Sequence, residues 1–271
     1  MDFIVTQNGI EHQTEGNSRL FSNDRPVYEV MRVMNGTALF LEDHFERLIF
    51  SAQTRGLPLD MEFSEFGHNI AKLSKINRKQ NGNVKFILSE VGKINHWSFS
   101  FIPHSYPVPN DYQKGVPTGL FFAERENPNA KIIQTTLSEK ASQMRADKKL
   151  HEVLLVDRNS LITEGSRSNV FFVKGNQFYT APASTVLEGI TRKKVLECLN
   201  ELDFTIIEKT VSISEIADFD AVFLTGTSPK VLPVNCIDSF HFQVKNSFVE
   251  QLMARFDLMI EAYLEVHMTC Q

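Results

Sequence analysis

The chain has 271 residues, which is enough for one large domain or two modest ones. Its formal charge of −5 at pH 7 and its lack of a lysine- or arginine-rich stripe argue against nucleic acid as a partner. No apolar run approaches the ~20 residues that a membrane-spanning helix needs, and the start, MDFIVTQNGIEH, has neither the basic nor the apolar region of a signal peptide.

The cysteines and histidines indicate where the protein resides and whether it binds a metal. Cys198, Cys236 and Cys270 are far apart in the chain, a pattern typical of reduced thiols, so we expect a cytoplasmic protein without disulfides. The eight histidines are scattered and form no HExxH motif, so the sequence predicts no metal site.

The first hundred residues read as strands and two helices. Asn-Gly pairs at 8–9 and 35–36 predict hairpin turns within residues 2–42. Apolar residues at helical spacing predict a helix over 43–56, which Asp43 caps and Gly56 ends. The last elements of this half are a helix at 62–79 and a pair of strands at 84–89 and 96–102.

A proline-rich stretch divides the chain. Residues 103–118 hold four prolines and one glycine, a composition typical of a linker. We therefore expect an N-terminal domain of residues 1–105, a linker of residues 106–118 and a C-terminal domain of residues 119–271.

The C-terminal half alternates strands with helices. The sequence predicts a polar helix in the second half of 131–150 and then a meander of antiparallel strands over 152–180. It further predicts helices at 190–202 and 246–266, with strands at 204–212 and 221–234.

Four short features could bind an anion or a cation. Glu164 ends a short strand beside Gly165, where a ligand could approach closely because glycine has no side chain. Residues 187–191 place a glycine at the opening of a helix, and residues 225–228, Thr-Gly-Thr-Ser, end a strand; both suit a phosphate. Arg47 offers a planar cation. Taken singly, each feature is more typical of an ordinary solvated turn, loop glycine, helix cap or surface residue.

Four longer segments, in the same order, resemble the class-IV, or fold type IV, family of pyridoxal-phosphate enzymes. This family includes branched-chain and D-amino-acid aminotransferases and 4-amino-4-deoxychorismate lyases. The segments are LEDHFERLIFSAQTRGLPL (41–59), HEVLLVDRNSLITEGSRSNVFFV (151–173), TAPASTVLEGITRKKVLE (180–197) and ADFDAVFLTGTSPKVLPV (217–234). The resemblance implies an α+β fold of two domains, a smaller α+β N-terminal domain and a larger β-rich C-terminal domain, and a homodimer with pyridoxal 5'-phosphate as the cofactor.

The resemblance also implies a role for particular residues. Lys131, 33 residues before Glu164, matches the lysine that forms a Schiff base with the cofactor. Glu164 matches the partner of the pyridine nitrogen. The remaining matches are phosphate-binding positions: Arg47, Ile190 through its backbone, Thr191 and Thr227. Lys140, Lys148 and Lys149 are rivals to Lys131, but they fall too late and in a polar helix.

The substrate-binding segments depart from the family pattern. Asn23-Asp24-Arg25-Pro26 stands where relatives have Tyr-Gly-Asp-Gly, although Tyr28 and Glu29 still match. Lys85 stands where many relatives have an arginine that holds a substrate carboxylate, and Ile132 begins a changed segment after Lys131. Two reactions therefore remain open: transfer of an amino group between an amino acid and a 2-oxo acid, or the lyase reaction that yields 4-aminobenzoate and pyruvate. A third alternative is a non-catalytic descendant that keeps the fold.

Overall fold

A computed structural model describes residues 2–14 and 25–268 of the chain. The chain forms two compact units. Unit 1 comprises residues 1–105, 130–133 and 260–271, and unit 2 comprises residues 106–129 and 134–259. Each unit is built around its own sheet, so the expected α+β fold with two domains is confirmed.

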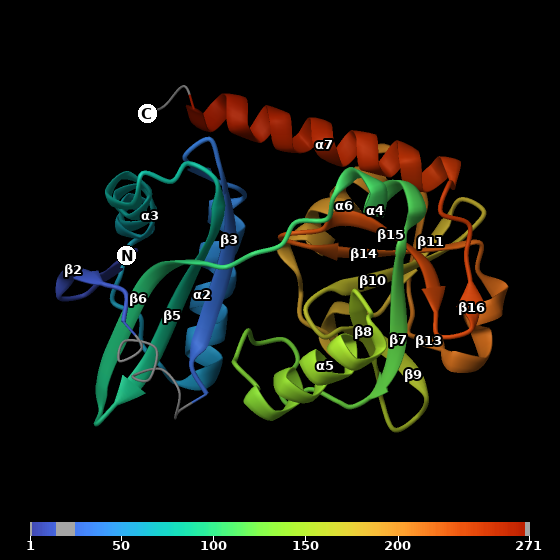
Figure 1. Cartoon of the computed structure of the whole chain (residues 1–271), viewed down its shortest axis with the longest axis horizontal. Helices are drawn as coiled ribbons and strands as arrows, with labels where there is room; N and C mark the ends of the chain where they lie inside the picture. The colour runs from blue at the N-terminus through green and yellow to red at the C-terminus, as the bar shows by residue number, and fades with distance from the viewer. Residues whose placement is uncertain (1, 15–24, 269–271) are drawn as a thin grey trace. The chain divides into compact units, whose positions relative to one another are not determined.

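Unit 1 is a six-stranded antiparallel sheet covered on one face by two helices (Figure 1). The strand order is β2-β1-β6-β5-β3-β4. The strands are β1 (Phe3–Thr6), β2 (Gly9–His12), β3 (Val27–Met34), β4 (Thr37–Ala38), β5 (Gly82–Val91) and β6 (Ile94–Ile102), and the helices are α2 (Leu41–Arg55) and α3 (Phe63–Asn77). The predicted hairpins, helices and strands of this half are therefore confirmed, except for the start of the first helix.

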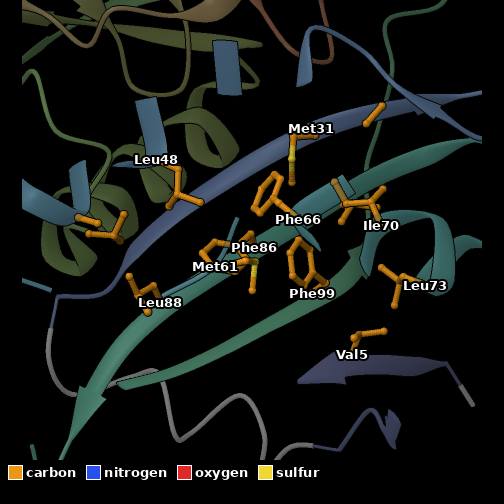
Figure 2. Packing of buried hydrophobic residues seen from close by; sticks show 14 of the residues in the cluster. Val5, Met31, Leu48, Met61, Phe66, Ile70, Leu73, Phe86, Leu88 and Phe99 are labelled. Carbon is orange, nitrogen blue, oxygen red and sulfur yellow. The ribbon is translucent and has the colours of Figure 1, made fainter. Parts of the chain in front are cut away.

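The core of unit 1 lies between this sheet and the two helices. Strand β3 alternates buried and half-buried residues, so that one of its faces meets the helices. Figure 2 shows Phe66 and Ile70 of α3 and Leu48 of α2 packed against Phe86 and Phe99 of the sheet. The rings of Phe66, Phe86 and Phe99 are 4.8–5.3 Å apart between centroids, a spacing at which aromatic pairs attract one another.

The start of helix α2 differs from the prediction. Phe40, which adopts a left-handed conformation at φ 51°, precedes the helix, and no side chain caps it. Asp43 lies inside the first turn, where its negative charge still favours the positive end of the helix dipole. Gly56 ends the helix at φ 71°, as predicted.

Unit 2 is built on a ten-stranded mixed sheet (Figure 1). The main path is β12-β11-β10-β14-β15-β7-β8-β9-β13, and β16 pairs with β15. The strands are β7 (Val116–Phe122), β8 (Glu152–Val156), β9 (Leu161–Gly165), β10 (Asn169–Lys174), β11 (Gln177–Thr180), β12 (Thr205–Glu208), β13 (Val211–Ser212), β14 (Ala221–Gly226), β15 (Lys230–Ile237) and β16 (Phe240–His241). The helical elements are α4 (Pro109–Lys114), α5 (Thr135–Lys148), η1 (Ala183–Thr185), α6 (Ile190–Glu201), η2 (Ile213–Asp218) and the first part of α7 (Ser247–Met268), which belongs to unit 1 from Ile260 onward.

The strands at the centre of unit 2 are buried on both faces. Every residue of β8 is buried, as are the first five of β10 and β14. The predicted meander over 152–180 is correct only within each hairpin. Strands β8 and β9 pair, and so do β10 and β11, but β9 and β10 are not neighbours in the sheet. Because β14, β15 and β7 lie between the two hairpins, the chain crosses the sheet after residue 165.

The proline-rich segment is folded. Residues 106–118, expected to form a linker, contain α4 and the first residues of β7. Pro109 suits the first turn of a helix, Gly115 ends that helix at φ 67°, and Val116 then pairs in parallel with β15.

Two short segments that were expected in the C-terminal domain belong to unit 1. Residues 130–133 pair with the edge of β3, and the end of α7 bonds to the start of α2. The Tyr263 hydroxyl accepts a hydrogen bond from the Leu41 N–H at 3.0 Å and donates one to Glu42 at 2.8 Å. Within the described parts of the chain, no helix has the length and apolar character needed to cross a membrane.

Candidate functional site

Lys131 is held at the edge of the unit 1 sheet by its backbone. The Tyr28 N–H donates to the Lys131 carbonyl at 3.1 Å, and the Lys131 N–H donates to the Ser51 hydroxyl of α2 at 3.1 Å. Val27 and Ile132 pair across the edge and are both buried, so the neighbouring side chains of Tyr28 and Lys131 share the opposite face. The Lys131 amine stands 4.7 Å from the centre of the Tyr28 ring.

Arg47 lies on α2, one turn before Ser51, in a buried network with Glu29 and His44. Its Nε and Nη2 atoms donate to the two carboxylate oxygens of Glu29 at 2.8 and 2.7 Å, a bidentate pair. The His44 Nδ1 lies 2.8 Å from Glu29 Oε2. This network fixes the plane and position of the Arg47 guanidinium group.

The charges in this network can be assigned. Burial alone would raise the pKa of Glu29, but Arg47 and His44 outweigh it and hold that pKa well below its usual range. Burial lowers the pKa of His44, so the ring is neutral at pH 7. Because an ionised carboxylate can only accept, the Nδ1 of neutral His44 must carry the proton that it donates to Glu29.

Glu164 is buried at the end of β9, with 3% of its surface exposed. This burial excludes the alternative, left open by the sequence, that Glu164 is exposed to solvent in a hairpin. Its Oε1 lies 2.9 Å from Arg125 Nε, and its Oε2 accepts the Leu187 N–H at 3.3 Å. The Arg125 Nε–H does not point at the carboxylate, so this contact is an ion pair rather than a hydrogen bond.

The absence of a side chain at Gly165 is needed for the tight turn that follows β9, not for the approach of a ligand. A side chain there would collide with the Ser168 hydroxyl and press on Glu152 at 3.1 Å. Buried Glu152 accepts hydrogen bonds from the hydroxyls of Ser166 and Ser168 at 2.6 and 3.0 Å. The small polar residues after Gly165 therefore close a tight turn around a buried carboxylate, which fixes the chain on the C-terminal side of Glu164.

Asn169 connects the other predicted cofactor positions of unit 2. Its side-chain amide donates to the Leu187 carbonyl at 2.8 Å, just before helix α6. A Cβ at Gly189 would collide with the Asn169 Oδ1, so only glycine fits at this position. Gly189 is the N-cap and no side chain caps the helix, so the first-turn N–H groups around Ile190 and Thr191 suit an anion.

The turn after β14 lies beside Asn169. Asn169 pairs with Thr225 across β10 and β14, and Thr227 follows two residues later. The buried Thr225 hydroxyl has no hydrogen-bond partner within the described chain. Leu187 therefore bonds to both Glu164 and Asn169 just before α6, and Asn169 pairs with the strand that ends at the turn bearing Thr227.

The six predicted site residues divide between the units. Lys131 and Arg47 belong to unit 1, whereas Glu164, Ile190, Thr191 and Thr227 belong to unit 2. The rival lysines, Lys140, Lys148 and Lys149, are all exposed. The departure at residues 23–26 lies partly outside the described residues.

Sequence reasoning did not single out Arg125 or Asn169 as partners in these networks. Arg125 and Asn169 act across long separations in the chain, 39 residues to Glu164 and 18 residues to Leu187, so no local spacing predicts them. By contrast, the three-residue spacing of His44 and Arg47 predicts that they are neighbours on the helix surface, and both indeed bond to Glu29.

Comparison with known proteins identifies the family. The family model described as amino-transferase class IV matches residues 26–237. The chain is 29% identical over 223 residues to a D-alanine aminotransferase of Bacillus licheniformis, covering 78% of both chains. It is 30% identical over 223 residues to a protein of Thermotoga maritima described as "Probable branched-chain-amino-acid aminotransferase", covering 80% of this chain and 78% of that protein.

Solved structures show the same fold. The branched-chain amino acid aminotransferase of Escherichia coli matches with a TM-score of 0.85 and 18% identity, covering 96% of this chain and 94% of that one. The arrangement is fold type IV. The protein belongs to the class IV aminotransferase family of pyridoxal-phosphate enzymes.

Proposed function

We propose that this protein uses pyridoxal 5'-phosphate to transfer an amino group between an amino acid and a 2-oxo acid, with Lys131 as the residue that bonds the cofactor. The observation that carries the proposal is the setting of Lys131. Its backbone is fixed by Tyr28 and Ser51, its amine stands over the Tyr28 ring, and Arg47 lies one turn away from Ser51 on α2.

Each unit has residues that fit part of this cofactor. In unit 2, the uncapped start of α6 and the hydroxyls of Thr191 and Thr227 suit a phosphate. In unit 1, the guanidinium of Arg47 is a planar cation that suits a phosphate. A pyridine nitrogen suits the buried carboxylate of Glu164. The unpartnered Thr225 hydroxyl beside this set also suits a polar ligand.

Bound pyridoxal phosphate supplies an aldehyde and an electron-withdrawing ring that stabilises negative charge at the substrate's Cα. Lys131 would bond the aldehyde at rest and, once the substrate amine replaces it, take the proton from Cα. Glu164 would hold a proton on the ring nitrogen, because an anion beside that nitrogen favours its charged form. Arg47, Ile190, Thr191 and Thr227 would keep the phosphate in place while the bond to Lys131 breaks and reforms.

A substrate screen tests this proposal. The cofactor-loaded protein should be screened with L- and D-amino acids and several 2-oxo acids. We expect amino transfer that depends on the 2-oxo acid and is lost in Lys131→Ala but retained in Lys140→Ala. Release of pyruvate from 4-amino-4-deoxychorismate, without any amino transfer, would replace the proposal with the lyase reaction.

We also propose that the protein is a cytoplasmic homodimer. Cys198 and Cys236 are free thiols, which is consistent with a reducing compartment, whereas Cys270 lies outside the described residues. Sedimentation of the cofactor-loaded protein tests the dimer: a monomer at working concentrations would contradict it.

A further inference from the structure

Two lysines of unit 1 face the same aromatic ring. The amine of Lys85, on β5, lies 5.3 Å from the centre of the Tyr28 ring, and that of Lys131 lies 4.7 Å from it. Lys85 pairs with Val30, two residues after Tyr28, so both side chains occupy the sheet face opposite the helices. The two amines are therefore no more than about 10 Å apart.

Lys85 has no anionic partner among the described residues. It forms no hydrogen bond or ion pair there, although it is half-buried. Lys79 provides a contrast in the same unit, since its amine lies 5.5 Å from the Phe101 ring but also pairs with Asp2 at 2.6 Å. A half-buried ammonium group that faces a second lysine without a carboxylate is unusual, because buried charges are ordinarily paired.

The titratable groups around this pair come from strand β3 and helix α2. Strand β3 contributes Tyr28 and, on the same face of the sheet, Arg32. Helix α2 contributes His44, whose pKa is lowered chiefly by burial, with a smaller contribution from the charge of Lys131. Glu29 is the carboxylate next to Tyr28, but it lies on the helix-facing side of the sheet and is bound by Arg47 and His44.

The pKa of Lys85 shows that its charge interacts with that of Lys131. Burial lowers its pKa, Tyr28 opposes that effect, and the positive charge of Lys131 lowers it further. Electrostatic coupling is mutual, so a proton on Lys85 makes it equally harder for Lys131 to keep its own.

We propose that Lys85 is a positioning residue for Lys131: its ammonium group beside the shared Tyr28 ring keeps the Lys131 amine neutral and ready to bond the cofactor. An ammonium has no lone pair, so only the neutral amine can attack an aldehyde carbon. The amine and the aldehyde then join with loss of one water molecule. This inference rests on the proposed role of Lys131 as the lysine that bonds the cofactor.

The size of the effect follows from the separation of the two amines, which is at most about 10 Å. Two unit charges about 10 Å apart in a medium of effective dielectric constant about 20 shift a protonation equilibrium roughly tenfold. The repulsion from Lys85 therefore corresponds to about one pH unit in the reactivity of Lys131.

The test follows the pH dependence of bond formation rather than turnover. Pyridoxal 5'-phosphate is mixed with the full-length protein at a series of pH values, and borohydride added at fixed times makes the bond permanent for mass mapping. In Lys85→Met and Lys85→Gln we expect the pH midpoint for labelling of Lys131 to rise by about one unit. Lys85→Arg keeps the positive charge and should retain the wild-type midpoint.

Lys79→Met is the matched control. It removes a lysine that also faces a ring of unit 1, but one whose charge is already balanced by Asp2, so the midpoint should not move. The fluorescence of Trp97, the sole tryptophan, verifies that each variant folds. A purely structural role for Lys85 would change the extent of labelling without changing its pH midpoint.

Two results would overturn the inference, and they have different consequences. If Lys131 is labelled but the midpoint in Lys85→Met equals that of the wild type or falls below it, Lys85 does not act on Lys131 and the proposed function stands. If the wild-type protein is labelled elsewhere or not at all, both the inference and the assigned role of Lys131 fail.

Discussion

Replacing Glu29 with glutamine should strongly destabilise unit 1. The carboxylate is fully buried, holds Arg47 through two hydrogen bonds and accepts a third from His44. Glutamine keeps the shape but loses the charge, and one of its acceptor atoms becomes a donor that faces the donors of Arg47. The Arg47 side chain is only 9% exposed, so it loses its carboxylate partner at a largely buried position. Removing one partner of a buried pair in this way costs about 3 kcal/mol or more.

Trp97 makes the measurement specific to unit 1, because it is the sole tryptophan and packs against that core. Chemical denaturation followed by its fluorescence gives the free energy of unfolding of this unit. Asp2→Asn is the control, since it breaks the Lys79 pair, whose two side chains are 40% and 42% exposed, and should cost at most about 1 kcal/mol.

The reasoning is refuted if Glu29→Gln loses no more stability than Asp2→Asn. A double variant, Glu29→Leu with Arg47→Met, removes both partners of the ion pair. It therefore separates the cost of removing one partner from the cost of losing the pair. Apolar replacement of both partners of a buried ion pair is often close to neutral. The double variant should therefore be more stable than Glu29→Gln alone.

Three further predictions concern pH, cofactor phosphate and thiol reactivity. The folded-state pKa of Glu29 lies below its ordinary value of 4.5, so the stability that Glu29 gives to the fold is present above that pH and is lost on acidification below it. The free energy of unfolding should therefore fall on acidification, and it should fall less steeply in Glu29→Gln. Asn169→Ala removes a hydrogen bond worth about 1 kcal/mol from the start of α6. The affinity for pyridoxal phosphate relative to that for pyridoxal should therefore fall about fivefold in titrations. An unchanged ratio of the two affinities would contradict the role given to Asn169. Burial raises the pKa of Cys198 to about 11, so peptide mapping should show iodoacetamide reacting faster at Cys236 than at Cys198, and equal rates would argue against this burial.

Local patterns predicted the elements of the chain better than their arrangement. The helical spacing of apolar residues identified α2, α3, α6 and α7, because that spacing follows from the geometry of one helix. The order of strands in unit 2 depends on pairs far apart in the sequence, such as β7 with β15. No local pattern indicated that β9 and β10, joined by a short turn, are separated in the sheet.

The same limit applies to the candidate site. The motifs identified Glu164 and the start of α6, yet whether Glu164 was solvated could be decided only by its burial beside Arg125. Proline content suggested a linker at 106–118, but proline also suits a first helical turn, and Pro109 occupies one. The role of Asn169 depends on the approach of Leu187, which only the folded chain provides.

The central claim is that Lys131 bonds the cofactor, and a single labelling experiment tests it most directly. The protein is loaded with pyridoxal 5'-phosphate, reduced with borohydride, digested and mapped by mass spectrometry. The label should lie on the peptide that carries Lys131 and be absent from the Lys131→Ala variant. A label on Lys85, Lys140 or another lysine, with Lys131 unmodified, would contradict the assignment.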